Sequence, residues 1–303
     1  MTTAYSVGIP VRNEEGTIIQ TLESILSQTI PPKQIHVCVN GSTDKTYNKV
    51  SDMASQEKKI SLTTSSPGKA NAWNKIVSEC SDNTMMFCDG DVVINHNAAE
   101  NMFSTFKSNP KLILVGGANA YFNSDNDTLF TKYFSEDSNG KPIKQDWVCG
   151  RLYMVKIKEL YDLAKKLEIE IMPPDTINED GLLELITSGY REIIDSAYNI
   201  STRISTFNDW KLCSKRILAG QKQIKQRYPQ YFGDSDFSMK RLKNYFDRFN
   251  EIEDWRKKVG VTTLFLLRTT LNIYYKSFNR LDYNPVWKET KSTKGNVMNY
   301  ERA

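Results

Sequence analysis

Two pairs of acidic residues are the groups in this 303-residue chain best suited to chemistry. The first pair lies in Asp89-Gly90-Asp91, directly after the apolar run Met85–Cys88. Mg²⁺ and Mn²⁺ prefer oxygen ligands and commonly use one or two carboxylates together with substrate phosphates. Asp89 and Asp91 are therefore candidate ligands of a divalent cation that also binds a diphosphate, and Gly90 permits a close backbone turn. An isolated Asp-x-Asp is also frequent in ordinary turns.

The second acidic pair, Glu179-Asp180, follows Pro173-Pro174 and precedes a helical pattern. One of these carboxylates could act as a general base that removes a proton from an attacking hydroxyl group. The alternative is structural, because acidic residues stabilise the positive end of a helix dipole.

Three further polar clusters come where a strand is expected to end or a helix to begin. They are Pro10-Val11-Arg12-Asn13-Glu14, Asn40-Gly41-Ser42-Thr43-Asp44-Lys45-Thr46 and Gly68-Lys69. The lysine and the free amide groups of a helix start could bind a phosphate. Helix capping explains many of these residue types equally well, so each cluster alone leaves both interpretations open.

Short β-rich runs alternate with helical patterns over the first 120 residues. Strands are expected at Ser6–Pro10, Ile35–Val39, Ile60–Thr63 and Met85–Cys88, and Trp147–Val155 is expected to form another. This alternation predicts an α/β fold with a mainly parallel sheet covered by helices on both faces. Ligands of such sheets bind beyond the carboxyl ends of the strands, which is where the polar clusters fall.

The later part of the chain has long helical patterns. We expect a catalytic domain at 1–207, a helical C-terminal extension at 208–287 and a loosely ordered tail at 288–303. Six basic residues and no acidic one lie between Lys211 and Arg227. This segment and the amphipathic Val259–Tyr275 could rest on an anionic membrane surface. They could equally pack against the catalytic domain or form a homo-oligomer.

The bulk composition excludes several classes of protein. Lys and Arg total 40 against 36 Asp and Glu, and a net charge of +4 is too small to indicate nucleic acid as a partner. Five cysteines without a Cys-x-x-Cys argue against a disulfide framework or a zinc site. No signal peptide and no membrane-spanning run of about 20 apolar residues is evident. We therefore expect a cytoplasmic protein, with possible peripheral contact at the inner membrane surface.

Taken together, the motifs resemble those of the family 2 glycosyltransferases, which have the GT-A fold. Val7–Glu14 is similar to the opening of that family, and Asn40–Thr46 to its second nucleotide-binding turn. Gly68-Lys69, Asp89-Gly90-Asp91 and Glu179-Asp180 fall where the phosphate lysine, the metal motif and the catalytic acid pair belong. The resemblance covers residues 5–220, and the combination is more specific than any single motif.

The resemblance implies metal-assisted transfer of a sugar from a nucleoside-diphosphate sugar to an acceptor hydroxyl, with inversion. Asp180 would be the base with Glu179 beside it, and Asp91 and Asp89 would bind Mn²⁺ or Mg²⁺. The donor would contact Pro10, Arg12, Asn13, Glu14, Asn40, Ser42, Lys69, Asp89, Gly90 and, from a later basic motif, Arg216. The position of Trp147, Gly150 and Arg151 places them on the acceptor side.

Two departures from the family pattern qualify these expectations. The second turn usually starts with two aspartates, and Val39-Asn40 stands there instead, so the base of the donor is open although a UDP-sugar is favoured. The Gln/Arg-x-x-Arg-Trp signature of processive polysaccharide synthases is missing, which favours transfer of a single sugar. The acceptor is unknown: a glycan, a lipid-linked intermediate or a small molecule would each fit.

Two other classes of protein remain as alternatives. A nucleotidyltransferase of similar fold would carry a glycine-rich, lysine-containing signature after the first strand, which Pro10–Glu14 does not match. A non-catalytic nucleotide-sugar-binding protein would be expected to have lost the key carboxylates, yet Asp89, Asp91 and Asp180 are all present.

Overall fold

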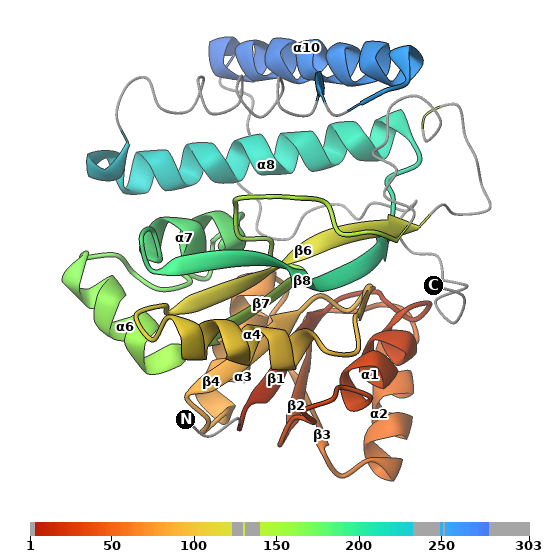
Figure 1. Ribbon diagram of the computed structural model, residues 1–303, viewed down its shortest axis with the longest axis vertical. Coiled ribbons are helices and arrows are strands. Elements are labelled where there is room, and N and C mark those ends of the chain that lie inside the picture. Colours follow the sequence, from red (N-terminus) through yellow and green to blue (C-terminus); the bar gives the residue numbers. More distant parts are fainter. Residues whose placement is uncertain (1–3, 123–129, 131–139, 233–248, 251, 279–303) are drawn as a thin grey trace.

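The computed structural model describes residues 4–122, 130, 140–232, 249–250 and 252–278. These residues form one eight-stranded sheet in the order β3-β2-β1-β4-β7-β6-β8-β5, with helices on both faces (Figure 1). The predicted α/β class, with a mostly parallel sheet and C-terminal helices, is confirmed.

The first half of the sheet is parallel and follows the predicted βαβ units. Its strands are β1 (Ser6–Val11), β2 (Ile35–Val39), β3 (Ile60–Thr64) and β4 (Thr84–Cys88). Helices α1 (Ile18–Leu26), α2 (Thr46–Gln56) and α3 (Lys69–Glu79) connect them. β1 pairs in parallel with both β2 and β4, so the carboxyl ends of these three strands meet at one edge.

The second half of the sheet is mixed. Its elements are β5 (Val92–Ile94), α4 (Ala98–Ser108), β6 (Leu114–Phe122), β7 (Leu152–Lys156), α6 (Ile157–Lys166), α7 (Glu179–Ile186) and β8 (Arg191–Thr202). β7 lies between β4 and β6 and runs antiparallel to both. The strand expected to start at Trp147 begins only at Leu152, because the residues before it form turns. This reversal brings the beginning of β7 to the carboxyl end of β4.

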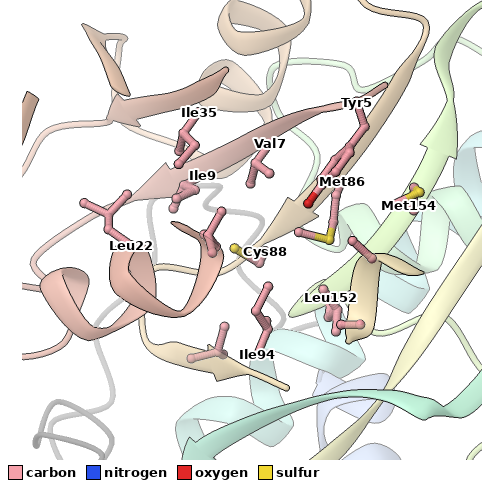
Figure 2. Close-up of a cluster of buried hydrophobic side chains, with 14 of the residues drawn as sticks. Tyr5, Val7, Ile9, Leu22, Ile35, Met86, Cys88, Ile94, Leu152 and Met154 are labelled. Atoms are coloured by element: carbon pink, nitrogen blue, oxygen red, sulfur yellow. The ribbon is translucent and has the colours of Figure 1, made fainter. Parts of the chain in front are cut away.

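Each face of the sheet has its own buried core. On one face α1, α2 and α4 cover a cluster in which Val7, Ile9 and Leu22 are fully buried (Figure 2). On the other face α3, α6 and α7 cover a second cluster that includes Trp73 and Leu160. Burial of this apolar surface is the main stabilising term, and it holds both edges of the sheet rigid.

Two long helices complete the described part of the chain. α8 (Phe207–Arg227) contacts α7, and the 3-10 turn η1 (Pro229–Tyr231) follows it. α10 (Trp255–Phe278) lies outside α8, on the side away from the sheet (Figure 1). Among the described residues, no helix combines the length and apolar character needed to cross a bilayer. The expected tail at 288–303 lies outside the described residues, and the division into domains stays a prediction.

Candidate active site

The candidate site is at the carboxyl end of β4, where the two acidic pairs come together. Asp89 follows β4 directly, and its amide donates to the carbonyl of Arg151 at a distance of 3.3 Å. Glu179 and Asp180 form the first turn of α7, which packs on the same side of the sheet as α3. The site therefore combines the end of β4, the turn entering β7 and the starts of α3 and α7.

Lys69 connects the two acidic pairs. Its Nζ lies 2.6 Å from Oδ1 of Asp89 and also forms an ion pair with Oε1 of Glu179. The lysine side chain is 21% exposed and the Glu179 side chain only 9% exposed, so little water competes with these contacts. Burial opposes the charge on Lys69, but the two carboxylates more than offset it and raise its pKa well above the ordinary value. Lys69 therefore remains a cation between the two pairs.

Asp180 lies beside this bridge, and its surroundings raise the pKa of its carboxyl group. Its Oδ2 accepts from the amide of Gly150 at 3.4 Å, and its Oδ1 accepts from the amide of Gly181 at 2.8 Å. Burial and the neighbouring Glu179 raise the pKa of Asp180 from 3.8 to about 6, although Lys69 and Arg216 act to lower it. A carboxylate with this pKa is mostly ionised at neutral pH yet basic enough to accept a proton.

Gly150 explains why the cluster can pack so closely. A Cβ at this position would lie 2.8 Å from Oε1 of Glu179 and 3.0 Å from Nζ of Lys69. The carbonyl of Gly150 also accepts from Nζ of Lys69 at 3.5 Å. Any side chain here would displace the ends of the ion-paired groups, so the absence of a side chain at Gly150 is part of the site.

The Asp89-Gly90-Asp91 turn is fixed to α1 and β1. The carbonyl of Gly90 accepts from Oγ1 of Thr17 at 3.0 Å and from Oγ1 of Thr21 at 3.1 Å. A Cβ on Gly90 would lie 2.7 Å from a methyl group of Val11, so this turn needs glycine for close approach to β1. These contacts hold the two aspartates at the sheet edge.

The donor set at this turn fits a cation that is shared with a substrate. Among the described residues no group of three or more His, Cys, Asp or Glu side chains is arranged to hold a metal ion by itself. Asp89 and Asp91 provide two carboxylates, and Mg²⁺ or Mn²⁺ commonly completes such a set with phosphate oxygens and water. The residues present therefore suit an ion that arrives with a diphosphate.

Arg151 sets the electrostatics on the other side of the two aspartates. Its guanidinium donates to the hydroxyls of Tyr121 at 3.1 Å and Ser201 at 3.0 Å, which fixes it between β6 and β8. Burial opposes its charge, but Tyr121, Cys149, Asp91 and Asp89 raise its pKa above the ordinary value. Arg151 therefore stays positively charged beside the aspartates.

The first two polar loops are joined to each other. The amide of Asn13 donates to Oγ of Ser42 at 3.0 Å, and the Asn13 carbonyl oxygen Oδ1 accepts from the amide of Thr43 at 2.7 Å. Asn13 has a φ of 52°, a conformation that asparagine tolerates better than most residues. Glu14 is buried, and its amide donates to the Thr46 hydroxyl at 2.8 Å. Asn13 and Ser42 therefore shape this edge of the sheet.

Asn40 connects β1 to the start of α3 through two side-chain hydrogen bonds. It is 4% exposed, and its Nδ2 donates to the carbonyl of Val11 at 2.9 Å. Its Oδ1 accepts from the amide of Gly68 at 3.3 Å. Asn40 thus ties the end of β1 to the start of α3, the helix that carries Lys69. Pro10 pairs with Cys38 inside the sheet, and Arg12 follows β1, half-buried.

α8 approaches the acidic pair closely enough to act on it. A Cβ on Gly220 would lie 2.3 Å from Cβ of Asn178, so glycine is needed for this contact. Gln223 accepts from the amide of Ile177 at 3.0 Å and donates to the carbonyl of Asp175 at 2.7 Å. Arg216, one turn before Gly220, is close enough to lower the pKa of Asp180.

The turn that enters β7 is tied to α7. The amide of Val148 donates to Oε2 of Glu184 at 2.7 Å, and the carbonyl of Trp147 accepts from Gln145 at 3.2 Å. Trp147 is half-buried. Of the three residues expected on the acceptor side, Gly150 contacts the acidic pair, and Arg151 acts on the aspartates.

The structure therefore brings five of the expected site residues together. Lys69, Asp89, Glu179, Asp180 and Gly150 are in direct contact. The sequence alone did not point to Thr17, Thr21 or Gln223. These side chains form hydrogen bonds with backbone groups that are far away in the sequence, and no local pattern predicts such bonds. A glycine inside a helical pattern, as at Gly220, does indicate a close contact.

The fold and this cluster define an α/β enzyme whose candidate site lies at the carboxyl edge of the sheet. Residues 6–154 match the sequence model of the family described as Glycosyl transferase family 2. Residues 6–154 therefore form a glycosyltransferase family 2 domain, as the motifs predicted.

Similar proteins were found in two further comparisons. The poly-beta-1,6-N-acetyl-D-glucosamine synthase of Staphylococcus epidermidis strain RP62A is 37% identical over 107 residues, which is 35% of this chain and 26% of that protein. The protein of the same name from Staphylococcus aureus strain MSSA476 is 31% identical over 106 residues, again 26% of its length. The match thus spans about a quarter of the length of these relatives.

Solved structures of S. aureus TarS are similar at low sequence identity. TarS 1–349 gives a TM-score of 0.47 at 16% identity and covers 73% of this chain and 65% of that one. TarS 1–349 in complex with UDP gives a TM-score of 0.46 at 11% identity, with 95% and 99% covered.

Proposed function

We propose that this protein transfers a single sugar from a nucleoside-diphosphate sugar, most favourably a UDP-sugar, to an acceptor hydroxyl with inversion at the anomeric carbon. The observation that carries this proposal is the Lys69 bridge between Asp89 and Glu179, with Asp180 beside it. The bridge joins the motif expected to bind the donor diphosphate to the motif expected to supply the base. One substrate can therefore contact both.

The proposed reaction is a single displacement. The acceptor oxygen forms a bond to the anomeric carbon while the bond from that carbon to the diphosphate oxygen breaks. Asp180 takes the proton of the acceptor hydroxyl, and its pKa of about 6 suits this role at neutral pH. Glu179 keeps Lys69 in position and raises the basicity of Asp180 through like-charge repulsion.

Asp89 and Asp91 would hold the Mn²⁺ or Mg²⁺ ion expected for this family. When bound, such an ion supplies positive charge that stabilises the departing nucleoside diphosphate. Lys69 and Arg216 add positive charge on the same side, and Arg151 stays charged next to the aspartates. The protein thus provides cations where negative charge increases during the reaction.

The joined loops after β1 and β2 would receive the nucleoside. Asn13, Ser42 and Asn40 fix the positions of these loops through backbone contacts, and Pro10, Arg12 and Glu14 lie along the same edge. In this assignment Asn13, Ser42 and Asn40 contribute to donor binding by holding the two loops in the shape that receives the nucleoside. The acceptor would enter from the side of Trp147, Gly150 and Arg151.

The names of the relatives indicate repeated sugar transfer, whereas the sequence of this chain indicates transfer of a single sugar. The named relatives are poly-beta-1,6-N-acetyl-D-glucosamine synthases. This chain lacks the Gln/Arg-x-x-Arg-Trp signature of processive enzymes, and we therefore propose single transfer, with N-acetylglucosamine as the first donor sugar to test. Mass spectrometry of the product would distinguish one added residue from a series.

A donor-hydrolysis screen tests the proposal without knowledge of the acceptor. The protein is incubated with UDP-, GDP- and dTDP-sugars, with Mn²⁺, with Mg²⁺ or with EDTA, and release of the nucleoside diphosphate is measured. We expect slow hydrolysis of one class of donor that depends on the metal ion. Thermal shift with UDP, GDP and dTDP provides the binding control. No hydrolysis and no nucleotide-dependent stabilisation under any condition would refute the proposal.

A further inference from the structure

The outer face of α10 is a surface outside the candidate active site that exposes large apolar side chains. α10 is the outermost layer of the described protein, and its inner side packs on α8 (Figure 1). Leu271 on this inner side contacts a small buried cluster with Leu218 and Ala219. Gly260 is buried as well, whereas several large apolar side chains on the opposite side of the helix are exposed.

Large apolar side chains form a stripe along this outer face. Trp255, Val259, Leu266 and Ile273 are 68%, 57%, 58% and 61% exposed. Their spacing of four, seven and seven residues places them on one side of the helix. A helix that is apolar on its outer as well as its inner side is normally covered on both.

The threonines of α10 make the outer face less polar than its composition indicates. The hydroxyl groups of Thr262, Thr263, Thr269 and Thr270 each donate to the carbonyl four residues earlier, at 2.8–2.9 Å. These hydroxyls are therefore satisfied inside the helix and do not depend on water. Threonines are well suited to an apolar environment when they are bonded in this way.

The charge of α10 selects the kind of partner. The helix contains Arg256, Lys257, Lys258, Arg268 and Lys276 and no acidic residue. The neighbouring acids, Glu253 and Asp254, precede its first residue, and Asp254 accepts from the amide of Arg256 at 2.9 Å. Two copies of α10 facing each other would bring like charges together, which disfavours self-association. A negatively charged surface complements the helix.

We propose that the outer face of α10 docks on the surface of an anionic phospholipid bilayer. The stripe of Trp255, Val259, Leu266 and Ile273 would enter the boundary between headgroups and acyl chains, and Arg256 and Lys258, which flank the stripe, would contact the headgroups. Trp255 near the beginning of the helix and Tyr274 near its end are suited to such a boundary, since their rings are apolar with a polar tip. This proposal concerns a surface outside the candidate active site and does not depend on the sugar-transfer chemistry.

Vesicle flotation tests the proposal directly. The full-length protein is mixed with vesicles of phosphatidylcholine and phosphatidylglycerol in a 1:1 ratio or with pure phosphatidylcholine, and the fraction that floats is measured. We expect binding to the anionic vesicles that weakens as salt is added, together with a blue shift of tryptophan emission. The Trp255→Phe variant should lose most of that shift.

Matched variants separate the apolar and electrostatic contributions. Leu266→Ser with Ile273→Ser should lower the binding constant about tenfold or more, since apolar surface no longer enters the bilayer. Arg256→Gln with Lys258→Gln should lower it by a similar factor through loss of headgroup attraction. Tyr161→Ser removes an exposed aromatic ring on α6 and should leave binding unchanged.

Two outcomes would overturn the proposal. The first is a wild-type protein that does not float with anionic vesicles at low salt. The second is light scattering that shows a dimer, dissociated by the Leu266/Ile273 variant, together with absence of flotation, which would assign the face to a second copy of the chain. Thermal denaturation of each variant verifies that it is folded, and the result stands whether or not a donor is hydrolysed.

Discussion

Replacing Asp180 with asparagine should abolish transfer while making the folded protein more stable at neutral pH. In the native protein the Asp180 carboxyl group is buried next to Glu179, and its pKa is raised from 3.8 to about 6. Ionising this group in the folded state is therefore less favourable than in the unfolded chain. An asparagine has nearly the same shape and never carries the charge.

The size of the effect follows from the pKa difference. A difference of about two units, at 1.36 kcal/mol per unit, corresponds to about 3 kcal/mol of unfavourable ionisation. Between pH 4 and pH 6 the unfolded chain binds fewer protons than the folded one, so this group lowers stability as pH rises and adds no further change above pH 6. Asparagine does not ionise, so the free energy of unfolding of the variant does not fall in this way between pH 4 and pH 6. Because part of the hydrogen bonding changes, we expect a gain of about 1–3 kcal/mol at pH 7.

Urea denaturation at several pH values measures this prediction. The free energies of unfolding of the wild type and Asp180→Asn are compared from pH 4 to pH 8, and their difference should grow up to about pH 6 and then stay constant. Asp162→Asn, an exposed aspartate on α6, is the matched control and should show no such difference. Donor binding by thermal shift should be nearly unchanged in Asp180→Asn, because the proposed role of this group is toward the acceptor.

Two results would refute this reasoning. If Asp180→Asn had the same stability difference at pH 4 and pH 7, the raised pKa would be wrong. If the variant retained full transfer activity, Asp180 would have to be abandoned as the base whatever its pKa.

Three other changes test separate parts of the site. Lys69→Met should weaken metal-dependent donor binding and raise the pKa of Asp180 further, which would move the acidic limb of the pH–kcat/KM profile up by about one unit; an unmoved limb would contradict the bridge. Gly150→Ala should lower kcat about tenfold or more with little loss of stability, because the new Cβ meets the mobile ends of Lys69 and Glu179; steady-state kinetics and urea denaturation on one preparation measure both. Gly220→Ala should instead destabilise the protein by about 1–3 kcal/mol, since its Cβ would lie 2.3 Å from Cβ of Asn178, which is held close to the backbone and cannot move aside, and an unchanged melting temperature would argue against that contact.

The sequence predicted the first, parallel half of the fold well because that half depends on local patterns. β2 coincides with the expected Ile35–Val39, and the strand before Asp89-Gly90-Asp91 begins one residue earlier than expected, at Thr84. Apolar runs bounded by polar turns define such strands without any long-range information. The family was predicted from the order of the motifs and is confirmed by the match over residues 6–154.

The second half was less accessible from the sequence for physical reasons. β6 contains Gly116-Gly117, and β8 mixes polar and apolar residues with a register shift at Gly117/Ala118, so neither has the simple alternation of a half-buried strand. The ion pair between Lys69 and Glu179 joins residues that are far apart in the chain. Only the complete fold brings them together, and no local pattern predicts that contact.

The reversed direction of β7 has a consequence for how this protein could have diversified. Because β7 begins at the edge where β4 ends, Gly150 and the residues of α7 reach the site from segments that come after the parallel half. In the proposed assignment, changes to the turn before β7 or to α7 would alter the acceptor that is bound while leaving the first four strands and their loops intact. Such an architecture would keep the part of the chain proposed to bind the nucleotide separate from the part proposed to select the acceptor.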